Sequence, residues 1–288
     1  MRRARLDGPL LRGRLLRGLD ARFFRALARA FGGAILFALP LLMTVEMWDL
    51  PLAVPPWRLA VFTLVALPLL TGLAWHAGFR HDVSWTDAAI DAGVAYLVGF
   101  VASAATLLLL AALGSDAGFA GGLARVALQA IPAAMGAAVA RSQLGAAARE
   151  DEERPQRESY AGELFLIGAG GLFFAFNVAP TEEIVLITLR QAHPLHALAT
   201  MAASIALMHA FVYAVGFKGQ HGWRAGRSGT AEFFALTLVG YALVLLVAAA
   251  VLGLFGRLDG QDPGAILHLT VVLAFPAALG GAVARLVL

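Results

Sequence analysis

The chain has 288 residues, of which 60% are hydrophobic and only 14% are charged, and its mean hydropathy is +0.76. This composition excludes a water-soluble globular protein, because the surface of such a protein would carry many more charged residues. The net charge is +3, and the absence of cysteine excludes disulfides and cysteine-based metal sites.

Residues 1–29 form a basic arm in which arginines alternate with leucine and phenylalanine. The apolar residues recur every three or four positions, which predicts an amphipathic helix lying on anionic lipid headgroups. A disordered basic arm is the alternative. The apolar run that follows is too long for the core of a cleaved signal peptide.

Eight apolar runs are each long enough to cross about 30 Å of hydrocarbon as a helix. They lie at about residues 27–48, 57–77, 87–113, 120–142, 161–189, 195–217, 231–256 and 264–288. A polar linker, residues 143–160, separates residues 30–142 from residues 161–288. The sequence therefore predicts an all-α transmembrane protein of eight helices, with four helices on each side of the linker.

Four short sequences recur in the same order on both sides of the linker. The pairs are residues 32–47 with 169–184, 78–80 with 216–218, 94–96 with 239–241 and 132–141 with 276–285. The last pair reads PAAMGAAVAR and PAALGGAVAR, and its small residues four apart suit close helix packing. These echoes predict two tandem four-helix repeats. Because each repeat has an even number of spans, both enter the membrane in parallel orientation, related by a pseudo-two-fold axis along the membrane normal.

Basic residues predict the orientation. Nine arginines lie within residues 1–29, and the basic residues of the linker fall on the same side of the membrane. The positive-inside rule then predicts a multi-pass protein of the bacterial cytoplasmic membrane with both termini in the cytoplasm.

Glu46 and Glu183 are the sharpest candidates for a functional site, because they occupy equivalent positions in the two repeats and fall within apolar runs. An ionised, unpartnered carboxylate inside a transmembrane helix costs at least about 2.5–3.5 kcal/mol, and such residues mark ion or proton paths. The pair predicts a metal or cation site in the outer half of the membrane. Glutamates that snorkel to the outer headgroups are the alternative.

Neighbouring oxygen atoms would complete such a site. Pro40 and Pro180 are predicted helix breaks that release backbone carbonyls, or else ordinary transmembrane kinks. Further side-chain oxygens come from Thr44, Thr181, Asn177 and Glu182. An all-oxygen set of this kind suits a hard cation such as Ca²⁺, Mg²⁺ or Na⁺.

Other charged residues could act elsewhere in the membrane. His209, deep in the sixth apolar run, is a candidate proton relay, or a neutral histidine hydrogen-bonded to a helix. Charges repeated near the cytoplasm predict an inner charged layer, either structural or gating. That layer comprises Arg80, Lys218, Asp87, Glu232, Arg141 and Arg285.

The predicted function is an ion channel or secondary transporter, with cations as the favoured substrate. A non-transporting membrane scaffold or partner-binding protein is the alternative. No hydrolase or nucleotide-binding motif is present, so an enzyme is not expected, and a membrane-embedded enzyme ranks third. The expected partners are the lipid bilayer, anionic headgroups at the arm, an inorganic cation and a further copy of the chain. Neither nucleic acid nor any cofactor beyond a bound cation is expected.

The segments FALPLLMTVEMW and FNVAPTEEI, together with the two PAAxGxAVAR endings, resemble a family of bacterial polytopic integral membrane proteins of uncharacterised activity. The resemblance covers nearly the whole chain from about residue 27. It implies multi-pass insertion into the membrane and no particular activity.

Overall fold

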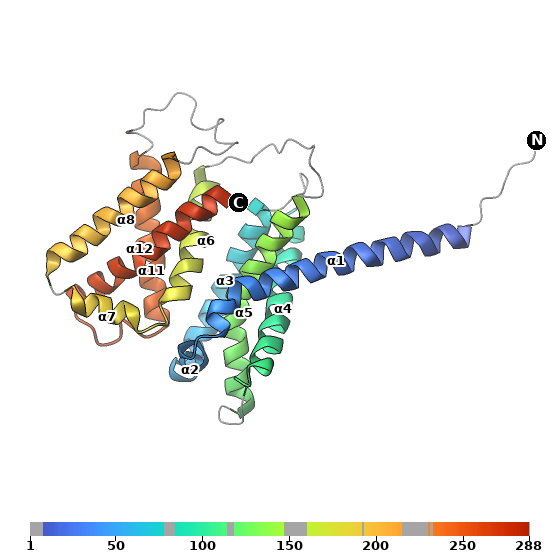
Figure 1. Cartoon of the computed structure of the whole chain (residues 1–288), viewed down its shortest axis with the longest axis horizontal. Coiled ribbons are helices and arrows are strands. Elements are labelled where there is room, and N and C mark those ends of the chain that lie inside the picture. The colour runs from blue at the N-terminus through green and yellow to red at the C-terminus, as the bar shows by residue number, and fades with distance from the viewer. Residues whose placement is uncertain are drawn as a thin grey trace, which may run out of the picture.

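The fold was analysed in a computed structural model, which describes residues 8–77, 84–113, 118–146, 160–191, 193–214, 230 and 233–287. Every regular element in these ranges is a helix (Figure 1). The first half comprises α1 (Gly8–Leu42), α2 (Glu46–Ala53), α3 (Pro56–Ala77), α4 (Trp85–Leu109) and α5 (Gly118–Ala146). The second half comprises α6 (Tyr160–Val178), α7 (Glu183–Arg190), α8 (Pro194–Ala214), the π-helix η1 (Phe233–Leu238), α11 (Val239–Leu254) and α12 (Pro263–Val287).

Eight helical segments within the described ranges are long and apolar enough to cross a membrane, which confirms the number of spans that the apolar runs predict. Helices are required there, because lipid offers no hydrogen bonds and each helix satisfies its own backbone groups. α1 is continuous from Gly8 to Leu42 and extends away from the bundle in Figure 1, so no break separates the basic arm from the first span. The side chains of residues 1–23 lie outside the described part of the structure, and the arm's binding to headgroups remains a prediction.

Proline and capping residues fix where the helices begin. Pro56, Pro194 and Pro263 are the first residues of α3, α8 and α12, where a missing backbone N–H costs nothing and the ring presets φ. α4 begins with a capping box, in which the Ser84 hydroxyl accepts from the Asp87 N–H and the Asp87 carboxylate accepts from the Ser84 N–H.

Two helices end through a residue in the left-handed conformation. Ala111 follows α4 with φ of 55°, and Gly256 follows α11 with φ of 71°. The next residues close each end, since the Ala112 N–H donates to the Leu107 carbonyl and the Arg257 N–H donates to the Leu252 carbonyl, both at 2.9 Å. These bonds satisfy carbonyls that the end of a helix leaves exposed.

A close helix crossing between two glycines occurs in each half. α1 meets α5 where Gly33 faces Gly136, and α6 meets α12 where Gly170 faces Gly280. A Cβ atom added to any of these glycines would collide with the backbone of the facing glycine. The small residues of the repeated PAAxGxAVAR sequence therefore serve the packing that the sequence predicts.

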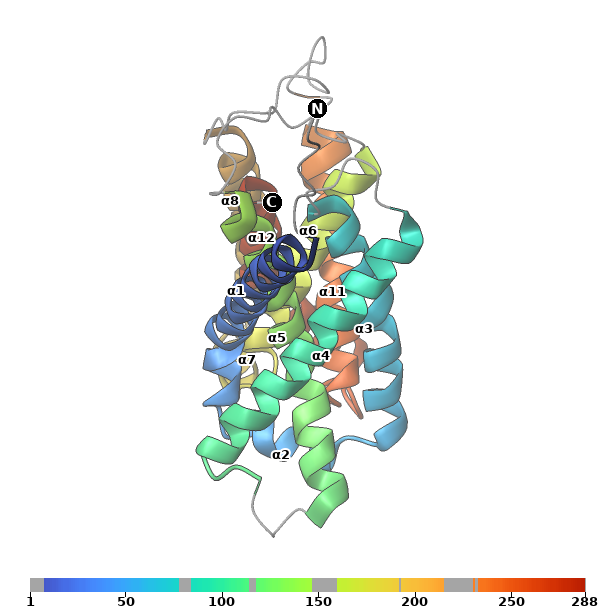
Figure 2. The same ribbon diagram turned by 90° about the vertical axis from the view of Figure 1, so that its right-hand side faces the viewer.

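The two short helices lie at one end of the bundle. α2 connects α1 to α3, and α7 connects α6 to α8, in the lower part of Figure 1. We call this the α2/α7 end, and the opposite end, where α5 stops and α6 starts, the linker end. Figure 2 shows α3, α4 and α5 side by side between these two ends.

The glycine crossings predict a sharp difference between adjacent positions. Gly33→Ala should lower the free energy of unfolding by about 1–3 kcal/mol, because the added methyl group overpacks the contact with α5. Gly32→Ala is the matched control, since a Cβ there meets nothing within 4 Å, and it should leave stability unchanged or raise it by about 1 kcal/mol. Unfolding of the purified protein in detergent measures both changes. Equal stability of the two variants would contradict the crossing as described.

Candidate functional site

The two candidate glutamates begin short helices and do not lie inside spanning ones. α1 and α6 end before them, and Glu46 and Glu183 are the first residues of α2 and α7, which have eight residues each. The expectation that the first and fifth apolar runs continue as single helices through these glutamates is therefore wrong. A carboxylate in the first turn of a helix is stabilised by the partial positive charge of that end.

The two proline positions differ in kind. Pro40 lies inside the last turn of α1, whereas Pro180 lies in the turn between α6 and α7, so Pro180 marks a helix end and not a kink. Next to them, the Thr44 hydroxyl donates to the Pro40 carbonyl, and the Thr181 hydroxyl donates to the Val178 carbonyl at 2.8 Å. Both threonines thus bind carbonyls that the helix ends leave exposed.

The acidic residues of the second half bind groups of their own chain. Glu182 Oε1 accepts a hydrogen bond from Arg257 at 3.0 Å, and Arg257 also donates to the Pro180 carbonyl. The Thr181 side chain, and then the backbone N–H of Glu183, hold the pKa of the Glu183 carboxyl below its usual range. These contacts fasten the connection between α6 and α7 to the connection between α11 and α12.

The predicted ligands are spread over separate helix pairs. α2, which carries Glu46, packs on α5, and α7, which carries Glu183, packs on α12. The Asn177 amide donates to the Phe173 carbonyl at 2.7 Å. In the ranges that the structure describes, no three His, Asp or Glu side chains gather closely enough to hold a metal ion. A site formed by the two glutamates alone remains a prediction.

An arginine that the sequence analysis missed anchors α2. Arg125 in α5 is 4% exposed, and its Nε donates to the Trp48 carbonyl at 2.7 Å while its Nη1 donates to the Ala112 carbonyl at 2.7 Å. Its Nη2 also lies 3.7 Å from the Asp49 carboxylate. The sequence held a signal for this role, because an arginine inside an apolar run requires a partner.

The predicted charged layer at the linker end is described only in part. Arg285 donates to Glu163 at 2.7 Å, which joins the end of α12 to the start of α6. Asp87 forms the capping box of α4 with Ser84. Arg80, Lys218, Glu232 and the side chain of Arg141 lie outside the described part of the chain. His209 lies in α8 with its Nδ1 3.0 Å from the Thr237 hydroxyl oxygen.

The two halves meet along a seam where α3 and α5 face α6 and α11. Phe62 of α3 stacks on Phe176 of α6, with ring centroids 4.9 Å apart and planes inclined by 3°. At the α2/α7 end, Arg58 of α3 donates to Asp259 at 2.8 and 3.0 Å and to the Gly253 carbonyl at 3.1 Å. A stacked aromatic pair and an ion pair therefore hold the halves together.

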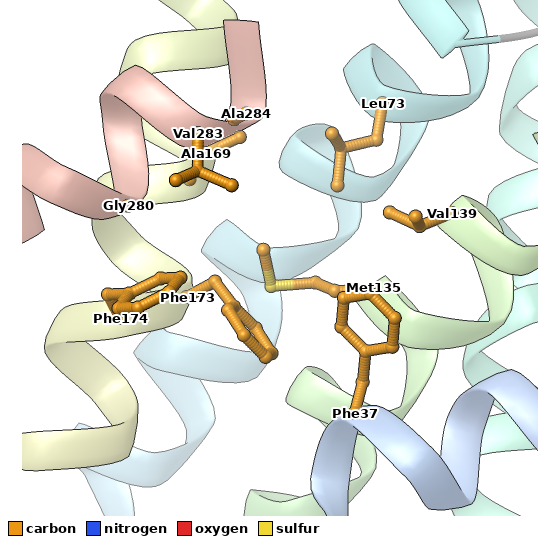
Figure 3. Close-up of a pocket in the computed structure, with 11 residues that line it drawn as sticks. Phe37, Leu73, Met135, Val139, Ala169, Phe173, Phe174, Gly280, Val283 and Ala284 are labelled. Carbon is orange, nitrogen blue, oxygen red and sulfur yellow. The ribbon is translucent and has the colours of Figure 1, made fainter. Parts of the chain in front are cut away.

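A cavity of about 140 Å³ lies in this seam (Figure 3). Its lining comes from α1, α3 and α5 of the first half and from α6 and α12 of the second. Phe37, Met135 and Phe173 point toward it from three helices, and the Phe37 and Phe173 ring centroids are 5.3 Å apart. The lining residues are Phe37, Leu73, Met135, Val139, Ala169, Gly170, Phe173, Phe174, Gly280, Val283 and Ala284.

The cavity does not have the chemistry of the predicted cation site. Every lining residue is apolar, and neither Glu46 nor Glu183 is among them. An ion that entered this cavity would lose its hydration without gaining oxygen ligands, at a cost of several kcal/mol. This cavity is therefore not the predicted cation site, which remains a prediction.

Comparison with known proteins places the chain among membrane proteins. Residues 26–288 match the model of the family described as "Putative integral membrane protein (DUF2391)". No curated protein and no solved structure matches the chain.

The ion pair of the seam predicts a pH-dependent stability. The hydrogen bonds from Arg58 hold the pKa of the Asp259 carboxyl below its ordinary value of 3.8. Because the pKa of Asp259 is depressed in the folded protein, the stability that the ion pair contributes is present above pH 3.8. That stability is lost as the pH falls through the folded pKa. Arg58→Gln should therefore lower the midpoint of thermal unfolding at neutral pH, and the difference from the unmodified protein should shrink below 3.8.

A pH series of thermal unfolding in detergent measures this difference. Arg190→Gln is the control, since Arg190 is an exposed arginine at the same end of the bundle. If the midpoints of thermal unfolding of Arg58→Gln and the unmodified protein differed by the same amount down to low pH, the stabilising role of the Arg58–Asp259 ion pair would be contradicted.

Proposed function

The chain belongs to the DUF2391 family of integral membrane proteins, and we propose that its function is to bind a hydrocarbon chain of a membrane lipid between its two halves. The observation that carries this proposal is the apolar cavity of about 140 Å³ in the seam. The proposed activity is binding and not catalysis. The proposed location is the bacterial cytoplasmic membrane with both termini in the cytoplasm, which the basic residues of the arm and linker support.

The size and lining of the cavity support a hydrocarbon occupant. An engineered apolar cavity of about 150 Å³ in another protein stays dry and takes up benzene. The cavity in the seam is of similar volume and equally apolar, so it would hold the last few carbons of an acyl chain. Water or an inorganic ion would find no hydrogen-bonding partner on its walls.

The surroundings of the cavity identify the source of that chain. Phe37, Val139, Phe174 and Val283 line the cavity but are only half-buried, so they also face the medium around the protein. All four lie within membrane spans, where that medium is lipid tails. A tail can thus reach the cavity sideways from the bilayer.

The proposal includes the tandem duplication, which would place the cavity on the axis between the two repeats. Phe37 and Phe174 are 137 positions apart, and Val139 and Val283 are 144 apart, which are the shifts of the repeated sequences. Three further pairs of features support the duplication: the two glycine crossings, the two eight-residue helices, and the left-handed residues that follow α4 and α11. Each pair is separated by between 137 and 145 positions.

Filling the cavity tests the proposal. The protein would be reconstituted with phosphatidylglycerol that carries a photoreactive diazirine near the end of one acyl chain, irradiated, and analysed by mass spectrometry. We expect labels on the cavity residues of α6 and α12, and we expect Val283→Phe to reduce them severalfold because the ring occupies the cavity. Val101→Phe, on the exposed side of α4, is the matched control. Labelling spread evenly over lipid-facing residues, or unchanged in Val283→Phe, would overturn the proposal.

Cation transport through the paired glutamates is the second candidate function. One observation favours it: Glu46 and Glu183 are each the first residue of an eight-residue helix at the same end of the bundle. Broken helices whose ends point at a shared site are a recurring device of secondary transporters. The ligands proposed for the cation are Glu46 and Glu183, with Thr44, Thr181, Asn177 and Glu182 around them.

Neutralising the glutamates tests this candidate. Glu46→Gln and Glu183→Gln should each reduce cation flux in reconstituted liposomes, and the double variant should lose little more, as expected for residues of one site. Asp262→Asn is the control, because it removes a carboxylate at the same end while asparagine retains the cap of α12. Flux that is equal in the unmodified protein and in both glutamine variants would exclude the paired site.

A further inference from the structure

A series of polar side chains runs along α8 in the second half, in a region that is otherwise apolar. It starts at the α2/α7 end, where the Nε2 of His268 in α12 lies 3.0 Å from the Gln191 Oε1. The amide nitrogen of Gln191 donates in turn to the Thr200 hydroxyl at 3.2 Å. These bonds carry hydrogen-bonding groups from the connection before α8 into the membrane span itself.

The series continues deeper into the span. Ser204, one helical turn after Thr200, is 1% exposed and donates to the Thr200 carbonyl at 2.7 Å. Beside Ser204 lies the hydroxyl of Tyr241 from α11, which is 3% exposed. The Tyr241 hydroxyl has no partner at full hydrogen-bond geometry, and Ser204 is the group that interacts with it. A buried hydroxyl that is not fully hydrogen-bonded is costly, and a water molecule between Tyr241 and Ser204 would satisfy both groups.

The series ends at a histidine near the linker end. Thr237, one turn before Tyr241, is 1% exposed, and its Oγ1 lies 3.0 Å from the Nδ1 of His209. Thr237 belongs to the π-helix η1, and π-helical turns occur frequently at functional sites. The ring of Phe233, at the start of η1, meets the His209 ring edge-on with centroids 4.9 Å apart.

The series covers most of the thickness of the membrane. At about 1.5 Å per residue, Thr200, Ser204 and His209 lie about 9, 15 and 22 Å along α8, which is itself about 31 Å long. His209 is therefore about 8 Å from the linker end of α8. Successive groups are one helical turn or less apart, and a single water molecule bridges such a gap.

These bonds are not needed to hold a half of this kind together. Under the proposed duplication, the residues at the positions of Gln191, Ser204, Thr237 and His268 in the first half are Val54, Ala66, Ala92 and Ala124. All four are apolar, yet the first half forms the same order of long and short helices. The complete series is thus particular to the second half, although Tyr96 and Thr71 stand at the positions of Tyr241 and His209.

We propose that this series conducts protons across the second half of the protein. It consists of His268, Gln191, Thr200, Ser204, Tyr241, Thr237 and His209. A histidine at one end takes a proton from the adjacent water and passes it to a neighbouring hydroxyl or bridging water, which releases its own proton to the next group. The histidine at the other end releases one proton to the opposite side, so each carrier returns to its starting state once the hydroxyls have reoriented. Gln191 positions the first two carriers. The inference does not rest on lipid binding, because none of these residues lines the cavity.

Proton flux into liposomes tests the inference. The full-length protein would be reconstituted with a pH-sensitive dye inside the vesicles, and a valinomycin-induced potassium potential would drive protons inward. We expect flux well above that of empty vesicles, and we expect Thr237→Val to reduce it by about a hundredfold because valine keeps the shape and removes the carrier. Thr237→Ser, which restores a hydroxyl, should recover most of the flux. Tyr241→Phe should reduce flux while it keeps the buried ring.

The matched control is Thr63→Val in α3 of the first half. Thr63 donates to the Leu59 carbonyl at 2.9 Å and lies beside Tyr96, much as Ser204 lies beside Tyr241, but within the described residues it bonds to no histidine. The control should conduct like the unmodified protein. Flux no greater than in empty vesicles, full flux in Thr237→Val, or equal loss in Thr63→Val would each overturn the inference. Size-exclusion profiles identical to that of the unmodified protein separate lost conduction from lost folding.

Discussion

The close approach of α1 to α5, and of α6 to α12, is the contact on which the rest of the structure depends. Inside a bilayer the side chains gain nothing by leaving lipid for protein, so helices associate through close packing of their surfaces. Gly33 against Gly136 and Gly170 against Gly280 let two pairs of backbones touch. Each half is therefore tightly packed within itself, and the halves meet over a narrower seam.

The same glycines determine the shape of that seam. Phe37 lies over Gly136, and Phe174 lies over Gly280, so each ring occupies the space that a larger residue would fill. Both rings also line the cavity. Bulky rings beside bare backbone leave a space that no side chain fills completely, because the rings are rigid and already packed on the glycines. The apolar cavity is thus a direct consequence of how each half is packed.

The eight spans could be predicted from the sequence, because each apolar run matches the thickness of the hydrocarbon. Helix breaks at Pro40 and Pro180 were among the predictions, but the separate short helices α2 and α7 were not, because the sequence stays apolar on both sides of the breaks. A signal for the start of α7 was present in Thr181 and Glu183, since a threonine followed by acidic residues is typical of a helix start. The cavity could not be predicted, because it depends on how the helices are rotated against one another. Arg125 was readable as a buried charge, but the carbonyls that it binds were not.

Matching positions in the two halves inform about folding, whereas differing positions inform about function. Gly33 and Gly170 match because both halves must bring two helices into contact, and Glu46 and Glu183 match because both begin a short helix with an acidic residue. A residue that matches between the halves is therefore explained first by a folding requirement that both halves share. Under the proposed duplication, the buried Ala66 and Ala92 stand in the first half at the positions of Ser204 and Thr237. A buried polar group that folding does not require, and that costs energy to bury, is the better guide to what the protein does.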